Sequence, residues 1–296
     1  MLATKTPILS NINAIKETRI TPKKGLFELN LKELWHYKDL LYLFVKRDII
    51  TVYKQTVLGP LWYLIQPLFT SVIFTLIFNN IAGISTAGVS SFLYNLAGII
   101  IWNYFADCIN GTSDTFKKNE AIFGKVYFPR VIVPISIMVS SLVKFGIQFL
   151  IFISFYFYFL LNDQAGQISW QIVYFPLIVI IMGVSGLSLG MVISSLTTKY
   201  RDLIFLVQFG VQLLMYLSAV MYPIALAKER LPSMLANLVS YNPLAIVIDN
   251  FRKIVFFNSL DFSFASFIYP FSFAFIMLFF GFLLFNRTEK SFIDTI

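Results

Sequence analysis

The amino-acid sequence predicts an all-α polytopic membrane protein. Its 296 residues are 58% hydrophobic and only 13% charged, and the mean hydropathy is +0.77. A water-soluble domain carries about 25% charged residues, so this chain has about half the polar surface that solubility requires. Its apolar runs are also longer than the roughly ten to fourteen residues of a buried core helix. We therefore expect most of the chain to cross a lipid bilayer as helices.

Six segments are predicted to cross the membrane, since a crossing helix needs about 17 to 25 apolar residues. They are residues 61–81, 92–108, 132–161, 172–196, 203–220 and 265–285. The third is long for a simple crossing, so we expect it to tilt or to extend beyond the interface. The small residues GVSG at 183–186 favour close helix packing in the fourth. Residues 61–285 are thus expected to form one transmembrane domain of six helices.

The residues before the first span divide into two parts. Residues 1–25 are polar and broken by prolines, which indicates a cytoplasmic tail. Residues 26–60 combine basic residues with apolar side chains at helical spacing, which predicts an amphipathic helix at the inner interface. The apolar positions are Leu34, Tyr37, Leu41 and Phe44. Gly59 and Pro60 are expected to end this helix.

Three of the segments outside the spans support a specific expectation. Residues 111–130 join the second and third spans and are long enough for a short helix on the membrane surface. Residues 221–264 lie on the other side of the membrane from the segment 111–130 and form the largest segment there. Two apolar stretches in it, 224–227 and 234–239, are too short to cross and favour re-entrant half-helices in the outer leaflet. Residues 286–296 form the C-terminal segment.

The distribution of basic residues predicts the topology. Of the 23 lysines and arginines, eighteen lie on the side of the two termini and four on the opposite side. Because basic residues are enriched in cytoplasmic loops, both termini are expected in the cytoplasm. The net charge of +8 then describes a surface that faces anionic lipid headgroups. No nucleic-acid-binding motif accompanies these residues, so nucleic acid is not expected as a partner.

The sequence offers little catalytic chemistry. It lacks the phosphate-binding loop G-x-x-x-x-G-K-[ST], so we do not expect this chain to hydrolyse ATP. One cysteine, Cys108, and one histidine, His36, supply neither a clustered metal site nor a histidine base within the bilayer. We therefore expect no catalytic residue, no metal and no cofactor bound by this chain.

Asp107 and Lys144 are the ionisable residues within the spans or near their ends. Charges inside a membrane are costly, which makes both residues candidates for function. Asp107 lies near the cytoplasmic end of its span, where water or a basic neighbour would solvate it. Lys144 lies deeper, where it would line a polar path, pair with a neighbour or serve the structure alone.

Aromatic residues make up 18% of the chain. Several recur at helical spacing in the third span, and two interpretations stay open. These side chains face lipid and the interface, or they form a smooth wall along which sugar rings slide. The candidates for such a glycan pathway are Trp62, Tyr63, Trp102, Phe145, Phe149 and Phe152.

Four motifs carry a resemblance to a known family. They are RDIITVYKQTVLGPLW at 47–62, GKVYFPR at 124–130, KYRD at 199–202 and YNPL at 241–244. In order, they are similar to the start, the entry into the third span, the loop before the fifth span and the external segment of one class of permease. This class is the membrane subunit of bacterial ABC-type polysaccharide exporters, which include O-antigen, capsule and teichoic-acid export permeases.

The resemblance implies a half-transporter in the bacterial cytoplasmic (inner) membrane. Two copies of this chain would pair with two copies of a separate ATPase, which would hold ATP and Mg²⁺. Residues 26–60 would act as a gate helix, and the loop at 111–130 would dock on the ATPase. The implied coupling residues are Phe116, Lys117, Lys118, Glu120, Phe123 and, as a secondary contact, Arg201.

The implied substrate is a polysaccharide linked to a polyprenyl diphosphate. The diphosphate needs cationic partners at the inner interface, because Arg and Lys are the preferred side chains for phosphate. The candidates are Arg47, Lys54, Lys125 and Arg130, whose alternative role is simple anchoring at the inner interface.

Other functions stay open as alternatives. An ABC-type permease could instead export a drug or a small lipid. An intramembrane acyl or glycosyl transferase would need a polar catalytic cluster, which neither His36 nor the isolated Asp107 supplies. A purely structural anchor would leave the basic loop and the external half-helices without a role.

Overall fold

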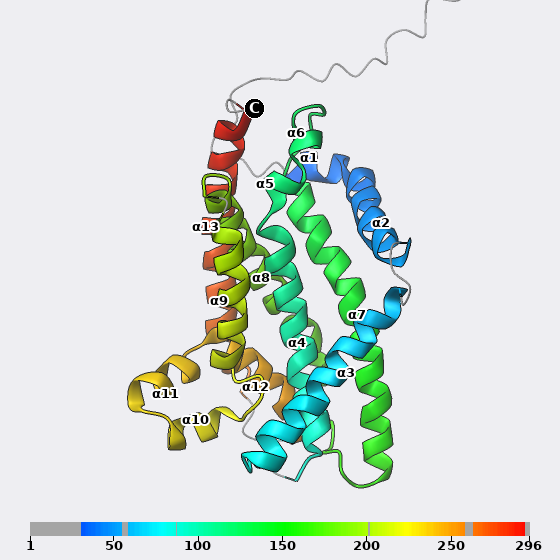
Figure 1. Ribbon diagram of the computed structural model, residues 1–296, viewed down its shortest axis with the longest axis vertical. Helices are drawn as coiled ribbons and strands as arrows, with labels where there is room; N and C mark the ends of the chain where they lie inside the picture. Colours follow the sequence, from blue (N-terminus) through cyan, green and yellow to red (C-terminus); the bar gives the residue numbers. More distant parts are fainter. Residues whose placement is uncertain (1–30, 55–58, 87, 201, 258–262, 294–296) are drawn as a thin grey trace, which may run out of the picture.

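The computed structural model describes residues 31–54, 59–86, 88–200, 202–257 and 263–293, and these residues are almost entirely helical. Within those ranges no strand occurs, and the only β contact is an isolated bridge between Gln167 and Phe257. The helices form an elongated bundle (Figure 1). Short helices cover both of its ends, with α5 and α6 at one end and α10 to α12 at the other.

Five helical segments are long and apolar enough to cross a membrane. The first is α3 (Trp62–Phe74), which continues as the π-helical η2 (Thr75–Ile81). The second and third are α4 (Ser91–Thr112) and α7 (Ile132–Leu161). The fourth joins η3 (Trp170–Tyr174) to α8 (Phe175–Thr197), and the fifth is α13 (Ala265–Ile293). The protein is therefore all-helical with several apolar spans, as predicted.

The expected span at 203–220 is shorter than predicted. It forms α9 (Leu203–Leu217), an apolar helix of 15 residues. The helix stops because Ala219 adopts a left-handed backbone with φ of 51°, which interrupts helical hydrogen bonding. In the described part of the chain, length and composition thus support five spans and one shorter apolar helix.

The predicted interfacial helix is divided in two. Its described part forms α1 (Leu31–His36) and α2 (Lys38–Lys54), with an interruption at Tyr37. Residues 1–30 and 55–58 lie outside the described ranges. Gly59 then takes a φ of 48° at the start of η1 (Gly59–Leu61), before the first span begins. The aromatic ring of Phe44 is buried against Phe128, with 5.7 Å between the ring centroids.

At the opposite end, three short helices replace the two that were expected. The predicted apolar stretches form α10 (Ile224–Arg230) and α11 (Ser233–Ser240). The third is α12 (Pro243–Phe256), which was not among the predicted helices. It begins where the Asn242 side chain accepts a hydrogen bond from the backbone N–H of Leu244. Insertion of α10 and α11 into a leaflet stays a prediction.

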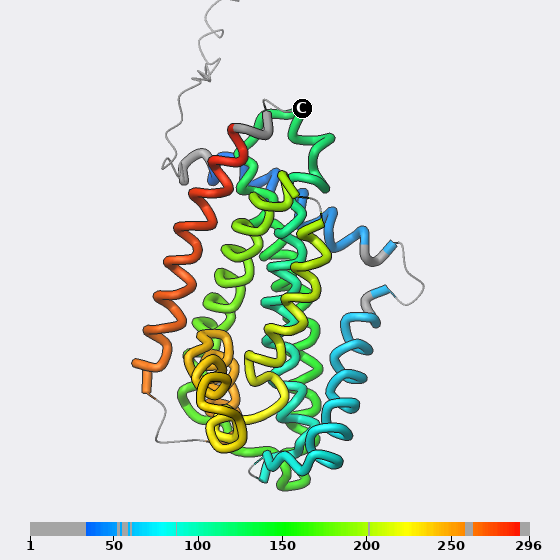
Figure 2. Tube along the Cα trace, turned by 60° about the vertical axis from the view of Figure 1, so that its left-hand side comes forward, coloured from blue at the N-terminus to red at the C-terminus, as the bar shows by residue number. Residues whose placement is uncertain are grey.

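The core forms where α4 packs against α8. Most of α4 is buried, whereas α3, α7 and α13 expose large apolar side chains. The helices α3 and α13 lie at opposite sides of the bundle (Figure 2). Gly186 makes the close approach possible, because a Cβ there would lie 2.7 Å from the Phe105 carbonyl oxygen and from the Cβ of Cys108. One turn further on, a Cβ at Gly190 would lie 2.6 Å from that of Thr112. The predicted close packing at 183–186 is confirmed.

We predict that Gly186→Ala destabilises the protein and that Gly146→Ala does not. The first substitution forces a methyl group into the backbone of α4, which costs about 1–3 kcal/mol. Gly146 of α7 has no described atom within 4 Å of a Cβ, so alanine there should be neutral or stabilise the helix by about 0.5–1 kcal/mol. Thermal unfolding of both variants in the same detergent tests this. Equal shifts of the two unfolding midpoints would contradict the requirement for a glycine where α8 meets α4.

Candidate functional site

Residues 111–130 are called the coupling segment, because the resemblance implies that they dock on an ATPase, and they combine buried aromatic rings with exposed charges. The segment contains two single-turn helices, α5 (Thr115–Lys118) and α6 (Glu120–Phe123). Phe116 and Phe123 are buried, and the ring of Phe116 lies 4.6 Å from that of Phe285 in α13. Lys117, Lys118, Glu120 and Lys125 are exposed, and so are the apolar side chains of Val126 and Tyr127. The segment is therefore held by its phenylalanines and presents an outer surface of mainly charged side chains with two apolar ones.

Polar contacts fix the shape of this segment. The Asn119 side chain lies between the two helices and donates a 2.9 Å hydrogen bond to the Thr115 carbonyl. The hydroxyl of Thr197, at the end of α8, donates a 2.8 Å hydrogen bond to the Ser113 carbonyl. The coupling segment is thus tied to α8 as well as being continuous with α4. The secondary contact predicted at Arg201 lies outside the described residues.

Arg130 connects the coupling segment to α13. Its side chain is buried, donating 3.1 Å and 3.5 Å hydrogen bonds to the carbonyls of Glu289 and Phe123. Its guanidinium also lies 5.0 Å from the Phe123 ring and 4.0 Å from the Glu289 carboxylate. Burial lowers the pKa of Arg130, and the Glu289 carboxylate opposes that shift. In this conformation Arg130 is engaged by protein groups.

The other three cations predicted for diphosphate are exposed. Lys54 ends α2, and Lys125 lies on the coupling segment. The Arg47 guanidinium lies 2.8 Å from the carboxylate of its neighbour Asp48 and covers the ring of Phe44. The four candidates therefore occupy two elements, α2 and the coupling segment, which touch through the rings of Phe44 and Phe128.

The two charges predicted within the spans pair with each other. The Lys144 ammonium of α7 lies 2.9 Å and 2.8 Å from the two carboxylate oxygens of Asp107 in α4. It also lies 5.1 Å from the ring of Tyr63 in α3. Pairing with a neighbour, one alternative for Lys144, is confirmed. The contact joins three helices, because each charge would be costly to hold unpaired among apolar groups.

Within the described residues, no group of three or more His, Cys, Asp or Glu side chains could hold a metal ion.

The aromatic candidates fall into two environments. Trp102, Phe145 and Phe152 are buried in the main core, so the lipid-facing interpretation is wrong for them. The ring of Phe149 is half-buried and stacks on Phe175 at 4.4 Å. Tyr63 is half-buried, whereas Trp62 at the start of α3 is exposed. A role in a glycan pathway stays a prediction for all six.

No functional or structural role was predicted for Arg252, because its charge was counted among the four basic residues of the external segment 221–264. Arg252 lies on the inner face of α12 and is 1% exposed. Its guanidinium donates a 2.9 Å hydrogen bond to the carbonyl of Ala219 and another to that of Val220. It also lies 3.9 Å from the ring of Tyr94 in α4. Arg252 thus fixes the turn that ends α9; its position among the apolar residues of 243–256 was the available signal.

We predict strong energetic coupling between Asp107 and Lys144. Asp107→Asn or Lys144→Met alone leaves one charge unpaired in apolar surroundings and should lower the thermal midpoint, whereas the double variant should recover much of the loss. The coupling energy from this double-mutant cycle should be at the upper end of about 0.5–3 kcal/mol.

A matched control for that cycle is the pair Asp249–Lys253 of α12, which has the same 2.8 Å separation within one helix. Such an i,i+4 pair contributes only about 0.3–0.5 kcal/mol. Equal coupling energies for the two pairs would contradict a special role for the contact between Asp107 and Lys144.

Comparison with known proteins assigns the chain to a family. The sequence pattern of the ABC-2 type transporter family matches residues 39–256. An O-antigen export system permease protein RfbA of Klebsiella pneumoniae is 26% identical over 256 residues, which cover 86% of this chain and 94% of the relative. A second RfbA of Klebsiella pneumoniae and one of Myxococcus xanthus are 28% and 23% identical, and each covers 78% of this chain and 85% of the relative. With its apolar helices, the chain is a multi-pass membrane protein that belongs to the ABC-2 type transporter family.

Proposed function

We propose that this chain is the transmembrane subunit of an ATP-driven exporter for a polysaccharide linked to a polyprenyl diphosphate. The observation that carries the proposal is the match to O-antigen export permeases over most of both chains. In this proposal the protein crosses the bacterial inner membrane six times, α9 is the fifth crossing, and both termini lie in the cytoplasm. The excess of basic residues on that side supports the orientation.

A separate ATPase supplies the energy in this proposal. It holds ATP and Mg²⁺, whereas this chain binds no cofactor and has no phosphate-binding loop of its own. Two ATPase subunits pair with two copies of this chain, since a two-fold ATPase dimer favours a two-fold permease. The exposed apolar faces of α3 with η2, and of α9, would then contact the second copy, the substrate path or lipid. Their exposed residues include Phe69, Leu76, Phe205, Phe209 and Leu213.

The coupling segment transmits the ATPase movement through three contacts. Its outer charges, Lys117, Lys118 and Glu120, meet the ATPase. Behind them, Phe116 packs on α13, and Arg130 holds the end of the same helix. The hydrogen bond from Thr197 passes movement to α8. Closure of the ATPase dimer would therefore displace α4, α8 and α13 together.

The inner interface receives the lipid-linked substrate in this proposal. The polyprenyl tail stays in lipid, and the diphosphate binds the exposed cations Arg47, Lys54 and Lys125. Arg130 acts instead as a positioning residue, because its guanidinium is buried against Phe123 and Glu289. The glycan then follows the path that ATPase closure opens.

We predict that Lys117→Glu/Lys118→Glu separates the permease from its ATPase. Both side chains are exposed, so charge reversal should leave the fold intact while removing contacts to the partner. Co-purification of the ATPase and export should both fall at least tenfold. The control is Lys228→Glu/Arg230→Glu, an exposed basic pair at the other end of the bundle. Unchanged export in the first variant would contradict this docking site.

We predict that Arg47→Gln/Lys54→Gln weakens the response to substrate. Each charge-assisted hydrogen bond is worth about 1.5–3 kcal/mol, so the substrate concentration for half-maximal ATPase stimulation should rise at least tenfold. Basal hydrolysis should stay unchanged. The matched variant Lys38→Gln/Lys46→Gln removes two other exposed charges from the same helix. Equal effects of the two variants would point to general surface charge.

A further inference from the structure

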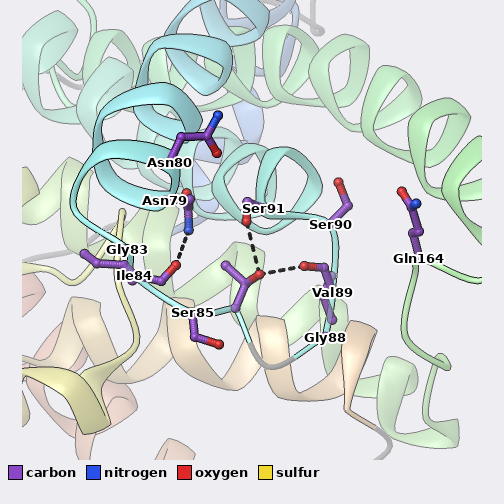
Figure 3. A pocket seen from close by; sticks show the side chains of 11 residues that line it. Asn79, Asn80, Gly83, Ile84, Ser85, Gly88, Val89, Ser90, Ser91 and Gln164 are labelled. Atoms are coloured by element: carbon purple, nitrogen blue, oxygen red, sulfur yellow. Dashed lines mark hydrogen bonds between the residues drawn. The ribbon is translucent and has the colours of Figure 1, made fainter.

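A polar pocket lies at the end of the bundle opposite to the coupling segment. Its volume is about 600 Å³, within the usual range for small-ligand sites. It is formed by the end of η2, the loop that follows, the start of α4 and the turn after α7 (Figure 3). The lining residues are Asn79, Asn80, Gly83, Ile84, Ser85, Thr86, Gly88, Val89, Ser90, Ser91 and Gln164. We propose that this outer pocket is a binding site for neutral sugar residues.

Buried polar contacts give the pocket a fixed shape. The Asn79 amide donates a 2.7 Å hydrogen bond to the Ile84 carbonyl, and the Thr86 hydroxyl donates a 2.6 Å bond to that of Val89 (Figure 3). Asn95 of α4 is completely buried and holds Asn79 in place through a 2.9 Å bond. The loop also contains Gly83 and Gly88, with φ of 66° and 87°, which other residues rarely adopt. A loop built in this way presents preorganised groups.

The lining chemistry selects neutral hydroxyl-bearing ligands. Within the described lining, each side chain is uncharged, and amide and hydroxyl groups outnumber the two aliphatic ones. An amide both donates and accepts hydrogen bonds, as a sugar hydroxyl does. A diphosphate or an acidic sugar would find no cationic partner in this lining, unlike at the inner interface. The two ends of the molecule thus offer complementary chemistry to the two parts of a lipid-linked glycan.

Two segments that are distant in the chain meet at this site. The backbone N–H of Ser90 donates a 2.9 Å hydrogen bond to the carbonyl of Gln164, and this contact fixes the turn after α7 beside the loop. The side chains of Asn80 and Gln164 are exposed on opposite sides of the pocket (Figure 3). This inference rests on the proposed function, because the pocket would then lie on the exit side and hold sugars as they leave.

The test compares Asn80→Ala/Gln164→Ala with Gln167→Ala in the complete complex with its ATPase, reconstituted in nanodiscs. Gln167 is an exposed glutamine three positions further along the same turn and does not line the pocket. The probe is a short delipidated oligosaccharide released from the polysaccharide that wild-type cells export. Loss of the two amides should weaken its binding about tenfold and reduce export at least twofold. Basal ATP hydrolysis and the affinity of Gln167→Ala should stay at the wild-type level.

Three outcomes would overturn the inference. Equal affinities of the double variant and Gln167→Ala would mean that the oligosaccharide does not bind at this pocket. Competition by inorganic phosphate would show an anion site, and displacement of the sugar by glycerophosphoethanolamine, the soluble headgroup of phosphatidylethanolamine, would show a lipid-headgroup site. Absence of any polysaccharide export by the wild-type complex would instead contradict the proposed function, so the two failures are distinguishable.

Discussion

The close packing of α4 is the constraint on which the other features of the structure depend. This helix contacts α3, α7, α8, α9 and α12, and its side chains are buried over most of its length. Four of the features of this structure touch it. Gly111 at its end begins the coupling segment, Asp107 pairs with Lys144, Tyr94 lies under Arg252, and Asn95 supports the outer pocket. Without the glycines of α8, α4 could not occupy this central place.

Three charged side chains in this structure are stabilised in three different ways. Lys144 forms an ion pair with a carboxylate. Arg252 donates hydrogen bonds to backbone carbonyls and lies on an aromatic ring. Arg130 donates hydrogen bonds to backbone carbonyls and lies 4.0 Å from a carboxylate. In each case the partners belong to another helix or loop, because no apolar helix can satisfy a charge with its own backbone. These contacts therefore fix how helices sit relative to one another.

The sequence predicted the apolar helices well because hydropathy is a local property. The span 132–161 matches α7, and 92–108 lies within α4. The prediction ended the last span at 285, whereas α13 continues to Ile293 through polar residues that hydropathy cannot assign to a helix. The break at Tyr37 and the early end of α9 were also missed, since each depends on local backbone geometry.

The site residues were predicted less completely because their environment is set by distant segments. Lys117 and Lys118 could be recognised as exposed from their place in a basic loop. Arg252 is buried on α12, whereas Lys253, which follows it, remains partly exposed, and only the helical spacing of the apolar residues in 243–256 separates the two. Likewise, Arg130 and Lys125 belong to the same motif, yet only Arg130 meets Glu289, which lies 159 positions further along the chain. The partner residue, and not the motif, decides the role.

The arrangement of these contacts suits a helix that moves as a single rod. The 22 residues of α4 span about 33 Å, from the coupling segment to the outer pocket. Its end at Thr112 is tied to α8 through Thr197, Asp107 near that end is tied to α7 through Lys144, and its other end is tied to α12 through Arg252. A displacement of the coupling segment along this rod would reach the turn after α9 and the pocket loop together, because Tyr94 and Asn95 are neighbours in the helix. In the proposed exporter, movement at the ATPase surface and release of sugars at the far end would thus be two ends of one rigid displacement.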